Sequence, residues 1–269
     1  MRLPDYHVHT RFSPDSSMEP QSAVEAAIRA GITDLCFTEH MDLGHNMEKY
    51  DCVPKLDEMA QSVRALGEKY PEIRIRSGLE AGYIPETAAQ TKDVLSSANF
   101  DYVLLSTHCV GGLDCCVPES TQGGDKPTAY RRYLEAVYES ITDESLADCY
   151  DCIGHIGYIA KCLHYEDNTF PYELFPQLFD DILRAIIKRE KGIEVNTSGI
   201  IRGGHVLPHP SIVARYHELG GRIITVGSDA HIAENVGLRI ADTLAMLKDC
   251  GFREVAVFSG REPEFIAIQ

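Results

Sequence analysis

The sequence contains no tryptophan and far fewer basic than acidic residues. Its 269 residues include 25 lysines and arginines against 41 aspartates and glutamates, which gives a formal net charge of −16. A surface this acidic repels a polyanionic backbone, and the lack of tryptophan removes one of the side chains on which bases stack. Long nucleic acids are therefore not expected as partners, whereas a small anionic substrate is compatible with a locally positive cleft.

The chain also lacks a long apolar run. No stretch approaches the roughly 18 residues that a membrane span requires, and the N-terminus, "MRLPDYHVHT", lacks the apolar segment of a secretory signal. With 44% hydrophobic and 25% charged residues, the composition is that of an ordinary globular protein. We expect a cytoplasmic protein with no membrane partner; the sequence makes no prediction about its oligomeric state.

A second CxxC motif, which would complete a four-cysteine zinc site with Cys149 and Cys152, is missing. The number of cysteines, nine, is odd, and the sequence shows no export signal. Reduced thiols are therefore expected. A redox pair or half of a zinc site at Cys149 and Cys152 is the less favoured interpretation. The adjacent Cys115 and Cys116 are likewise expected to be ordinary thiols.

Helical and strand patterns alternate along the whole length, which predicts an α/β protein with a parallel sheet. Seven or eight βα units in one domain, residues 1–269, fit a (β/α) barrel better than an open sheet. After the first strand, which contains His7 and His9, we expect strands over 33–40, 72–80, 100–108, 150–155, 192–199 and 222–231. We expect helices over 22–30, 55–69, 86–97, 128–146, 172–191 and 211–219, with a last helix and strand closing the chain. Residues 45–53 and 110–126 are expected to be loops over one face.

Histidines and carboxylates stand at the ends of the expected strands. In a parallel barrel all strand C-termini meet at one rim, where active sites are built. Alone, an HxH pair or a strand-end histidine is more often structural than a ligand. Together, six strands deliver such side chains to one small volume, namely His7, His9, His40, Glu80, His108, His155, Asp229 and His231.

Histidine combined with carboxylate is a ligand set typical of zinc, manganese or iron. The number of imidazoles exceeds what one ion can use, so the sequence predicts more than one divalent transition metal ion. Carboxylates such as Glu80 and Asp229 are able to bridge two ions. Neighbouring ions of this kind support the hydrolysis of phosphate esters.

The motifs "HVH", "TEH", "GLE", "STH", "IGH" and "SDAH", in this order, resemble the polymerase and histidinol phosphatase (PHP) family. The resemblance covers essentially the whole chain and implies a distorted (β/α)7 TIM-like barrel with two to three metal ions. It implies three ligand sets: His7, His9, Glu80 and Asp229; Glu80, His108 and His155; and His40, His231 and Asp15. Many members of the family have a histidine where this sequence has Asp15, so the third site departs from the commonest pattern.

The stretches "FSPDSS", "EVNTSG" and "IIRGG" resemble the stand-alone L-histidinol-phosphate phosphatases of histidine biosynthesis. That resemblance implies a metal-dependent phosphatase for a small phosphomonoester. Arg202 and Lys161 stand where family phosphatases place cations toward the phosphoryl group, although either is also compatible with a solvated surface position. Asn196 either orients substrate or caps a turn. Asp229 or His231 would transfer the proton to the leaving alcohol.

Other functions remain open at this point. A phosphodiesterase or nuclease of the same family, acting on nucleotides or short oligonucleotides, would be expected to show a basic or aromatic track, which this sequence lacks. A protein-tyrosine phosphatase of the family is a further alternative. A non-enzymatic metal-bound module is less favoured, because every expected ligand position carries a residue able to bind metal.

Overall fold

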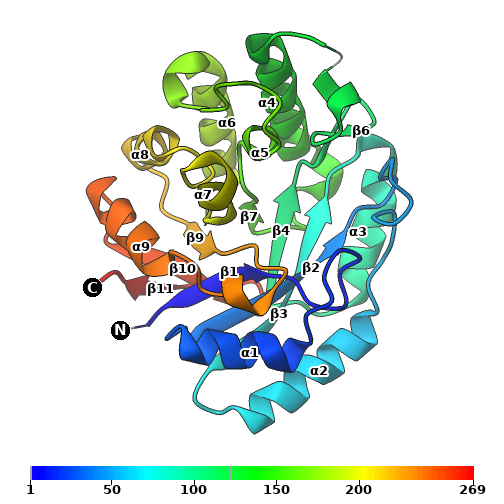
Figure 1. The fold of residues 1–269 in the computed structure, drawn as a ribbon, viewed down its shortest axis with the longest axis vertical. Coiled ribbons are helices and arrows are strands. Elements are labelled where there is room, and N and C mark those ends of the chain that lie inside the picture. Colours follow the sequence, from blue (N-terminus) through cyan, green and yellow to red (C-terminus); the bar gives the residue numbers. More distant parts are fainter. Residues whose placement is uncertain (1, 122) are drawn as a thin grey trace.

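The computed structural model describes residues 2–121 and 123–269, and seven parallel strands form its centre (Figure 1). The strands of this sheet lie side by side in the order in which they occur in the chain. Each connection crosses over and places the next strand of the sheet beside the previous one. The strands are β1 (Pro4–Val8), β2 (Asp34–Met41), β3 (Arg74–Gly82), β4 (Tyr102–Ser106), β7 (Cys152–Ile153), β8 (Gly192–Asn196) and β9 (Ile224–Gly227).

The first and last strands of this sheet meet and bring the barrel close to closure. His9 N donates to Ala230 O at 2.9 Å, and Asp229 N donates to His7 O at 2.7 Å. Only isolated bridging joins the two strands here, and β1 carries an irregularity between Asp5 and Val8. The predicted distorted (β/α)7 barrel is therefore confirmed.

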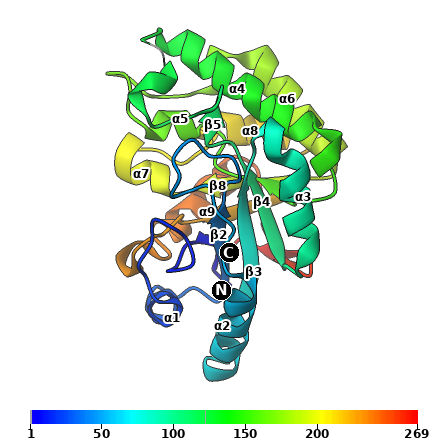
Figure 2. The same cartoon turned by 90° about the vertical axis from the view of Figure 1, so that its right-hand side faces the viewer.

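Amphipathic helices cover the outside of the sheet, and Figure 2 shows them on the flanks of the strands. Buried apolar residues recur at helical spacing on each, as Ala23, Val24 and Ala27 do on the first. Their bounds are α1 (Pro20–Arg29), α2 (Leu56–Lys69), α3 (Ala88–Ser97), α4 (Lys126–Thr142), α6 (Pro176–Lys188), α8 (Pro210–Glu218) and α9 (Ile240–Asp249). Of the helices that the structure describes, none is both long and apolar enough to cross a membrane.

The C-terminal segment differs from the expected single strand. It forms an antiparallel hairpin of β10 (Glu254–Ser259) and β11 (Glu262–Ala267) outside the seven-stranded sheet. Phe258 N donates to the hydroxyl of Tyr6, and that hydroxyl donates to Phe258 O, both at 3.1 Å. Gly260 N also donates to Asp101, immediately before β4, so the hairpin covers the end of the barrel where the strands begin.

The opposite end, where the strands finish, carries the irregular segments. The expected loop 45–53 contains no helix or strand, and the expected loop 110–126 contains the second strand of a short hairpin, β5 (Cys109–Val110) with β6 (Leu113–Asp114). That loop also contains a 3-10 turn, Pro118–Thr121; Gln122 lies outside the described residues. Two short helices, α5 (Tyr158–Lys161) and α7 (Ser198–Gly203), complete this end.

The prediction that all cysteines are reduced thiols is wrong for two of them. A disulfide joins Cys116 to Cys162, 46 residues further along the chain, with 4.7 Å between their Cα atoms. The fold brings these positions together across two connections, and sequence spacing alone does not reveal such pairing. Cys115, Cys149 and Cys152 are free and buried, so no bond joins the two cysteines of the CxxC motif.

Candidate active site

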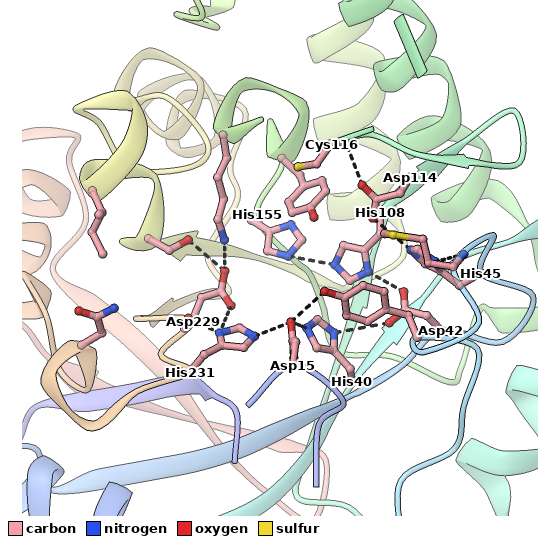
Figure 3. A pocket seen from close by; sticks show the side chains of 17 residues that line it. Asp15, His40, Asp42, His45, His108, Asp114, Cys116, His155, Asp229 and His231 are labelled. Carbon is pink, nitrogen blue, oxygen red and sulfur yellow. Dashed lines mark hydrogen bonds and ion pairs between the residues drawn. The ribbon is translucent and has the colours of Figure 1, made fainter. Parts of the chain in front are cut away.

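A cavity of about 430 Å³ opens at the C-terminal end of the barrel strands (Figure 3). Its lining includes Asp15, His40, His108, His155, Asp229 and His231. Beneath it, completely or almost completely buried, lie His7, His9 and Glu80. The structure therefore brings all nine sequence-predicted metal ligands into one continuous cluster.

Glu80, at the end of β3, lies between two groups of imidazoles. Its Oε2 atom is 3.2 Å from His7 Nε2 and 3.4 Å from His9 Nε2. Its Oε1 atom is 3.2 Å from His108 Nε2 and 2.7 Å from His155 Nε2. One carboxylate thus faces both of the first two predicted ligand sets, which is the placement that a bridging ligand requires.

Asp229 also divides its two oxygens between different neighbours. Its Oδ1 atom lies 3.4 Å from His9 Nε2 and 3.7 Å from His7 Nε2, while its Oδ2 atom lies 2.6 Å from Lys161 Nζ. The backbone of Asp229 has φ 54°, a left-handed conformation that is uncommon for non-glycine residues, although aspartate tolerates it better than most. Next to it, Asp229 N donates to His7 O in β1.

The third predicted set is the most exposed part of the cluster. Asp15 Oδ2 lies 3.2 Å from His231 Nε2 and 3.6 Å from His40 Nε2. The hydroxyl of Tyr50 donates to the same carboxylate oxygen at 3.4 Å. Asp15 is thus placed where the family resemblance requires a ligand, on the loop between β1 and α1.

Buried carboxylates that the sequence analysis missed hold the imidazoles in orientation. Glu194 Oε1 accepts from His7 Nδ1 at 2.6 Å, and its other oxygen accepts from His155 N at 2.8 Å. Asp42 Oδ1 accepts from His108 Nδ1 at 2.6 Å. The two contacts to Nδ1 atoms leave Nε2 of His7 and of His108 facing the cluster, as the hydrogen bonds that orient metal-ligating histidines do, whereas the contact to His155 N fixes the backbone.

A signal for these two carboxylates exists in the sequence. Asp42 stands two residues after His40, and Glu194 stands two residues before Asn196, so each shares a strand face with a residue already singled out. The hydroxyl of Ser13 acts similarly beside His9 Nδ1, at 3.0 Å, and it donates to the buried Glu39 at 2.6 Å.

Opposite effects of burial and charge act on the protonation of the cluster. Burial raises the pKa of Glu80, but the neighbouring His7, His108 and His40 lower it by more. The pKa of Glu80 is therefore well below its usual range. Burial lowers the pKa of His108, but Asp42 and Glu80 raise it to about 10. Burial together with His40 and His231 holds the pKa of His9 well below 6.5. The carboxylates therefore favour positive charge beside them, whereas burial and the neighbouring imidazoles disfavour it on His9.

The residues present fit transition metal ions. Glu80 Oε2 and His231 Nε2 are buried, and although oppositely charged or imidazole atoms lie 3.2 Å away, neither makes a hydrogen bond of acceptable geometry to the described residues. Ligand atoms from sets of three lie within 4.8 Å of one another, among them His7, His9 and Glu80; His7, His155 and Asp229; His40, Glu80 and His108; and His9, His40 and His231. Imidazoles mixed with carboxylates in such groups are typical of zinc, manganese and iron sites.

The three predicted substrate-binding residues have different placements. Lys161, at the end of α5, lines the cavity beside Asp229. Asn196 is completely buried, and its Oδ1 accepts from the backbone and hydroxyl of Ser198, so the structure favours turn capping over substrate contact. Arg202 lies in α7, but its side chain is outside the part of the chain that the structure describes.

The side of the cavity away from Asp229 is formed by the two expected loops, which contact each other. His45 Nε2 and Asp114 Oδ2 are 3.1 Å apart, and Asp114 N donates to Asn46 at 2.9 Å. Figure 3 shows His45 and Asp114 on one side of the cavity and Asp229 and His231 on the other. The cavity thus has a cationic side chain, Lys161, near one end and a buried carboxylate, Asp114, at the other.

Known proteins with similar sequences share nearly the whole chain. A family model described as the PHP domain matches residues 5–198. The histidinol-phosphatase of Lactococcus lactis subsp. lactis (strain IL1403) is 31% identical over 264 residues, which are 97% of this chain and 96% of that protein. The probable histidinol-phosphatase of Clostridium acetobutylicum is 30% identical over 251 residues, covering 93% of this chain and 95% of that protein.

A solved structure has the same architecture. The crystal structure of histidinol phosphate phosphatase from Lactococcus lactis subsp. lactis, complexed with zinc, L-histidinol and phosphate, matches with a TM-score of 0.88 at 30% sequence identity. The match covers 98% of this chain and 99% of that chain. The similarity therefore includes every strand that contributes to the cluster.

Proposed function

Because the chain belongs to the PHP domain family, we propose that it is a metal-dependent phosphomonoesterase that hydrolyses L-histidinol phosphate to L-histidinol and phosphate. The observation that carries the proposal is the convergence of imidazoles and carboxylates beneath one cavity, in a chain similar over its whole length to histidinol-phosphatases. This reaction would make it an enzyme of histidine biosynthesis.

Two to three divalent ions would be held by the residues of the cluster, and zinc is favoured over manganese and iron because the similar structure contains zinc. One ion would be held by His7, His9, Glu80 and Asp229, a second by Glu80, His108 and His155, and a third by Asp15, His40 and His231. Such ions lower the pKa of bound water and neutralise phosphoryl oxygens.

The residues of the chain would position the phosphate and move the proton. Lys161 and the hydroxyl of Ser198 both contact Asp229 Oδ2, at 2.6 and 3.0 Å, so this corner of the cavity would bind phosphate oxygens. We propose Arg202, on the same short helix as Ser198, as a further phosphate contact. Asp229 or His231 would deliver the proton to the leaving alcohol, because both line the cavity.

The opposite end would receive the leaving group. L-Histidinol has an amine and an imidazole, and the buried carboxylate of Asp114, paired with His45, offers a negative charge at that end. The ring of Tyr158 and the side chain of Met47 also line the cavity and would pack against an imidazole. This asymmetry favours a cationic phosphomonoester over a dinucleotide.

A phosphate-release assay would test the proposal. Zinc- or manganese-loaded enzyme should hydrolyse L-histidinol phosphate faster than other small phosphomonoesters, and Glu80→Ala should be inactive. Faster turnover of a dinucleotide or of a phosphotyrosine peptide would overturn the choice of substrate. Fewer than two equivalents of transition metal in protein purified without chelators would argue for the non-enzymatic alternative.

The location of the enzyme follows from the same substrate. A phosphomonoester dianion does not cross a lipid bilayer unaided, because burial of such charge in hydrocarbon is strongly unfavourable. An enzyme that consumes an intracellular intermediate of this kind would act in the cytoplasm, and cell fractionation with activity measurement would test that location.

A further inference from the structure

The Cys116–Cys162 disulfide connects two walls of the candidate active site. Cys116 lines the cavity, and Cys162 directly follows Lys161, the cation that contacts Asp229. Figure 3 shows Cys116 beside Asp114 at the cavity. Both cysteines are half-buried, so small reagents can reach the bond.

The Cys116 side of the bond is firmly attached to the barrel. Cys116 N donates to Asp114 Oδ1 at 2.6 Å, and Cys115 N donates to His108 O at 2.7 Å. Cys109 and Asp114 pair across the β5–β6 hairpin. Cys116 is thus fixed to the segment that follows β4 and carries a proposed metal ligand.

The Cys162 side is held much less firmly. Helix α5 has only four residues, which is too short to be stable without tertiary contacts. Its beginning is anchored, because Gly157 N and Tyr158 N donate to the hydroxyl of Tyr133. Ile159 and Ala160 of α5 are buried, but Leu163 beyond its end is exposed and has φ 57°. Among the described residues, 162–164 are bonded to the hairpin segment by the disulfide and by the bond of 2.5 Å between His164 Nε2 and Cys115 O.

We propose that Cys116–Cys162 is a thiol–disulfide modification site that sets the activity of this enzyme. The intact bond holds the end of α5, and with it Lys161, at the phosphate corner of the cavity. Cleavage leaves the C-terminal end of α5 tied to the hairpin by one hydrogen bond, so Lys161 spends less time at Asp229. This inference rests on the proposed function for the role of Lys161 and on the proposed cytoplasmic location, where disulfides are usually transient and redox-sensing.

The chemistry is thiol–disulfide exchange with a dithiol reductant. A thiolate of the dithiol attacks one sulfur of the bond and forms a mixed disulfide, and the other cysteine leaves as a thiolate. The second thiol of the reductant then closes its own disulfide and releases the remaining cysteine. Two electrons pass to the enzyme, and the two protons of the dithiol end on Cys116 and Cys162. Exchange with glutathione disulfide reverses the change.

Kinetics of the two redox states would test the proposal. Zinc-loaded enzyme oxidised with glutathione disulfide is compared with enzyme reduced by a water-soluble phosphine. The phosphine is oxidised to the phosphine oxide, whose oxygen comes from water, and it is removed before the assay. We expect reduction to lower kcat/KM for L-histidinol phosphate about tenfold, mainly through KM, as for a partly lost charge-assisted contact. Amide exchange of residues 158–166 should become faster, and zinc content should not change.

Variants separate this effect from a general loss of stability. Cys162→Ser should match the reduced enzyme and should not respond to reductant, whereas Cys250→Ser, at a free cysteine that does not line the cavity, should behave as wild type. In a Lys161→Met background, Cys162→Ser should cost little more activity, because the tether acts through Lys161. A purely structural role would lower activity equally in both backgrounds.

Equal kcat/KM, equal affinity for inorganic phosphate and equal amide exchange in the two states would overturn the proposal. Failure of glutathione disulfide to form the Cys116–Cys162 bond, as seen by peptide mapping, would also overturn it. If L-histidinol phosphate is not hydrolysed in either state but phosphate affinity still falls on reduction, the tether stands and the proposed function is wrong.

Discussion

Glu80 faces two groups of imidazoles with the two oxygens of one carboxylate. Replacement by glutamine preserves the volume and still allows the contact with Ser106, but it removes a negative charge and one ligating oxygen. We expect Glu80→Gln to lose at least one equivalent of zinc and to lower kcat by at least about 10³, because water activation and charge neutralisation both depend on the ions. Metal analysis and phosphate release measure the two effects.

A conservative change away from the cluster provides the control for that prediction. Glu135 is exposed on α4, and Glu135→Gln should leave both zinc content and kcat unchanged. Full metal content together with wild-type kcat in Glu80→Gln would show that Glu80 does not bridge two ions.

Glu194 is expected to act through His7 rather than on the ion itself. Glu194→Gln removes the negative charge and replaces one carboxylate oxygen by an NH2 donor, so the side chain can no longer accept through separate oxygens from both His7 Nδ1 and the backbone His155 N. We expect zinc affinity to fall about 10- to 100-fold while the stoichiometry at saturating zinc is retained. Competition titration against a chromophoric chelator measures the affinity; a reduced stoichiometry would instead identify Glu194 as a ligand.

Residue placement explains which parts of the site could be predicted. The imidazoles and carboxylates at strand ends could be predicted from the sequence. Parallel strands finish at one rim of a barrel, so the position of a residue in its strand implies its position in space. Glu194 and Asp42 were missed although each stands two residues from a residue already singled out, because the imidazoles that they contact, His7 and His108, come from other parts of the chain. The pairing of Cys116 with Cys162 was missed for the same reason.

At the scale of elements, the register of β9 against β1 sets the spacing of the cluster. Gly227 leaves room for this approach: a Cβ atom there would lie 2.3 Å from His7 Cβ and 2.6 Å from Glu194 Oε1. We expect Gly227→Ala to push β9 from β1, to lower the free energy of unfolding by about 1–3 kcal/mol and to weaken zinc binding. Urea unfolding and zinc titration measure these effects.

A glycine with free space provides the matched control. Gly67 lies within α2 and has no atom within 4 Å of an added Cβ. Gly67→Ala should therefore raise the free energy of unfolding by about 0.5–1 kcal/mol through helix propensity, with unchanged zinc affinity. If both alanine variants had the same stability as wild type, close approach at Gly227 would not limit the strand packing.

Most elements were predictable because their apolar periodicity is strong, and the departures have local causes. The expected last strand is instead a hairpin, joined by a two-residue turn at Gly260 and Arg261, both with positive φ. Such turns favour Asn-Gly or Asp-Gly, and arginine at the second position gives no turn signal. The pattern of alternating helices and strands then favoured one further βα unit over a hairpin.

The whole molecule separates a stabilising end from a functional end. The hairpin of β10 and β11 lies where the strands begin, whereas the ligands and the cavity lie where the strands finish. In barrels of this kind, one end supplies stability and the other end supplies chemistry. The acidic surface does not conflict with an anionic substrate, because Lys161 provides local positive charge at the site.

This separation leads to a prediction at Phe258. The ring is buried, and its centroid lies 4.9 Å from that of the Tyr102 ring. The backbone of the same residue is bonded to the hydroxyl of Tyr6. We expect Phe258→Ala to lower the free energy of unfolding by about 3–5 kcal/mol, because it leaves a cavity beneath the barrel. At a temperature where the variant is folded, kcat/KM should stay within about twofold of wild type, since the hairpin lies at the end of the barrel opposite the cavity. Urea unfolding of the zinc-loaded protein and phosphate release at low temperature measure both quantities.

A fall in kcat/KM as large as that of Glu80→Gln, in folded protein with full zinc content, would mean that the base of the barrel positions the active site and that the two ends are coupled.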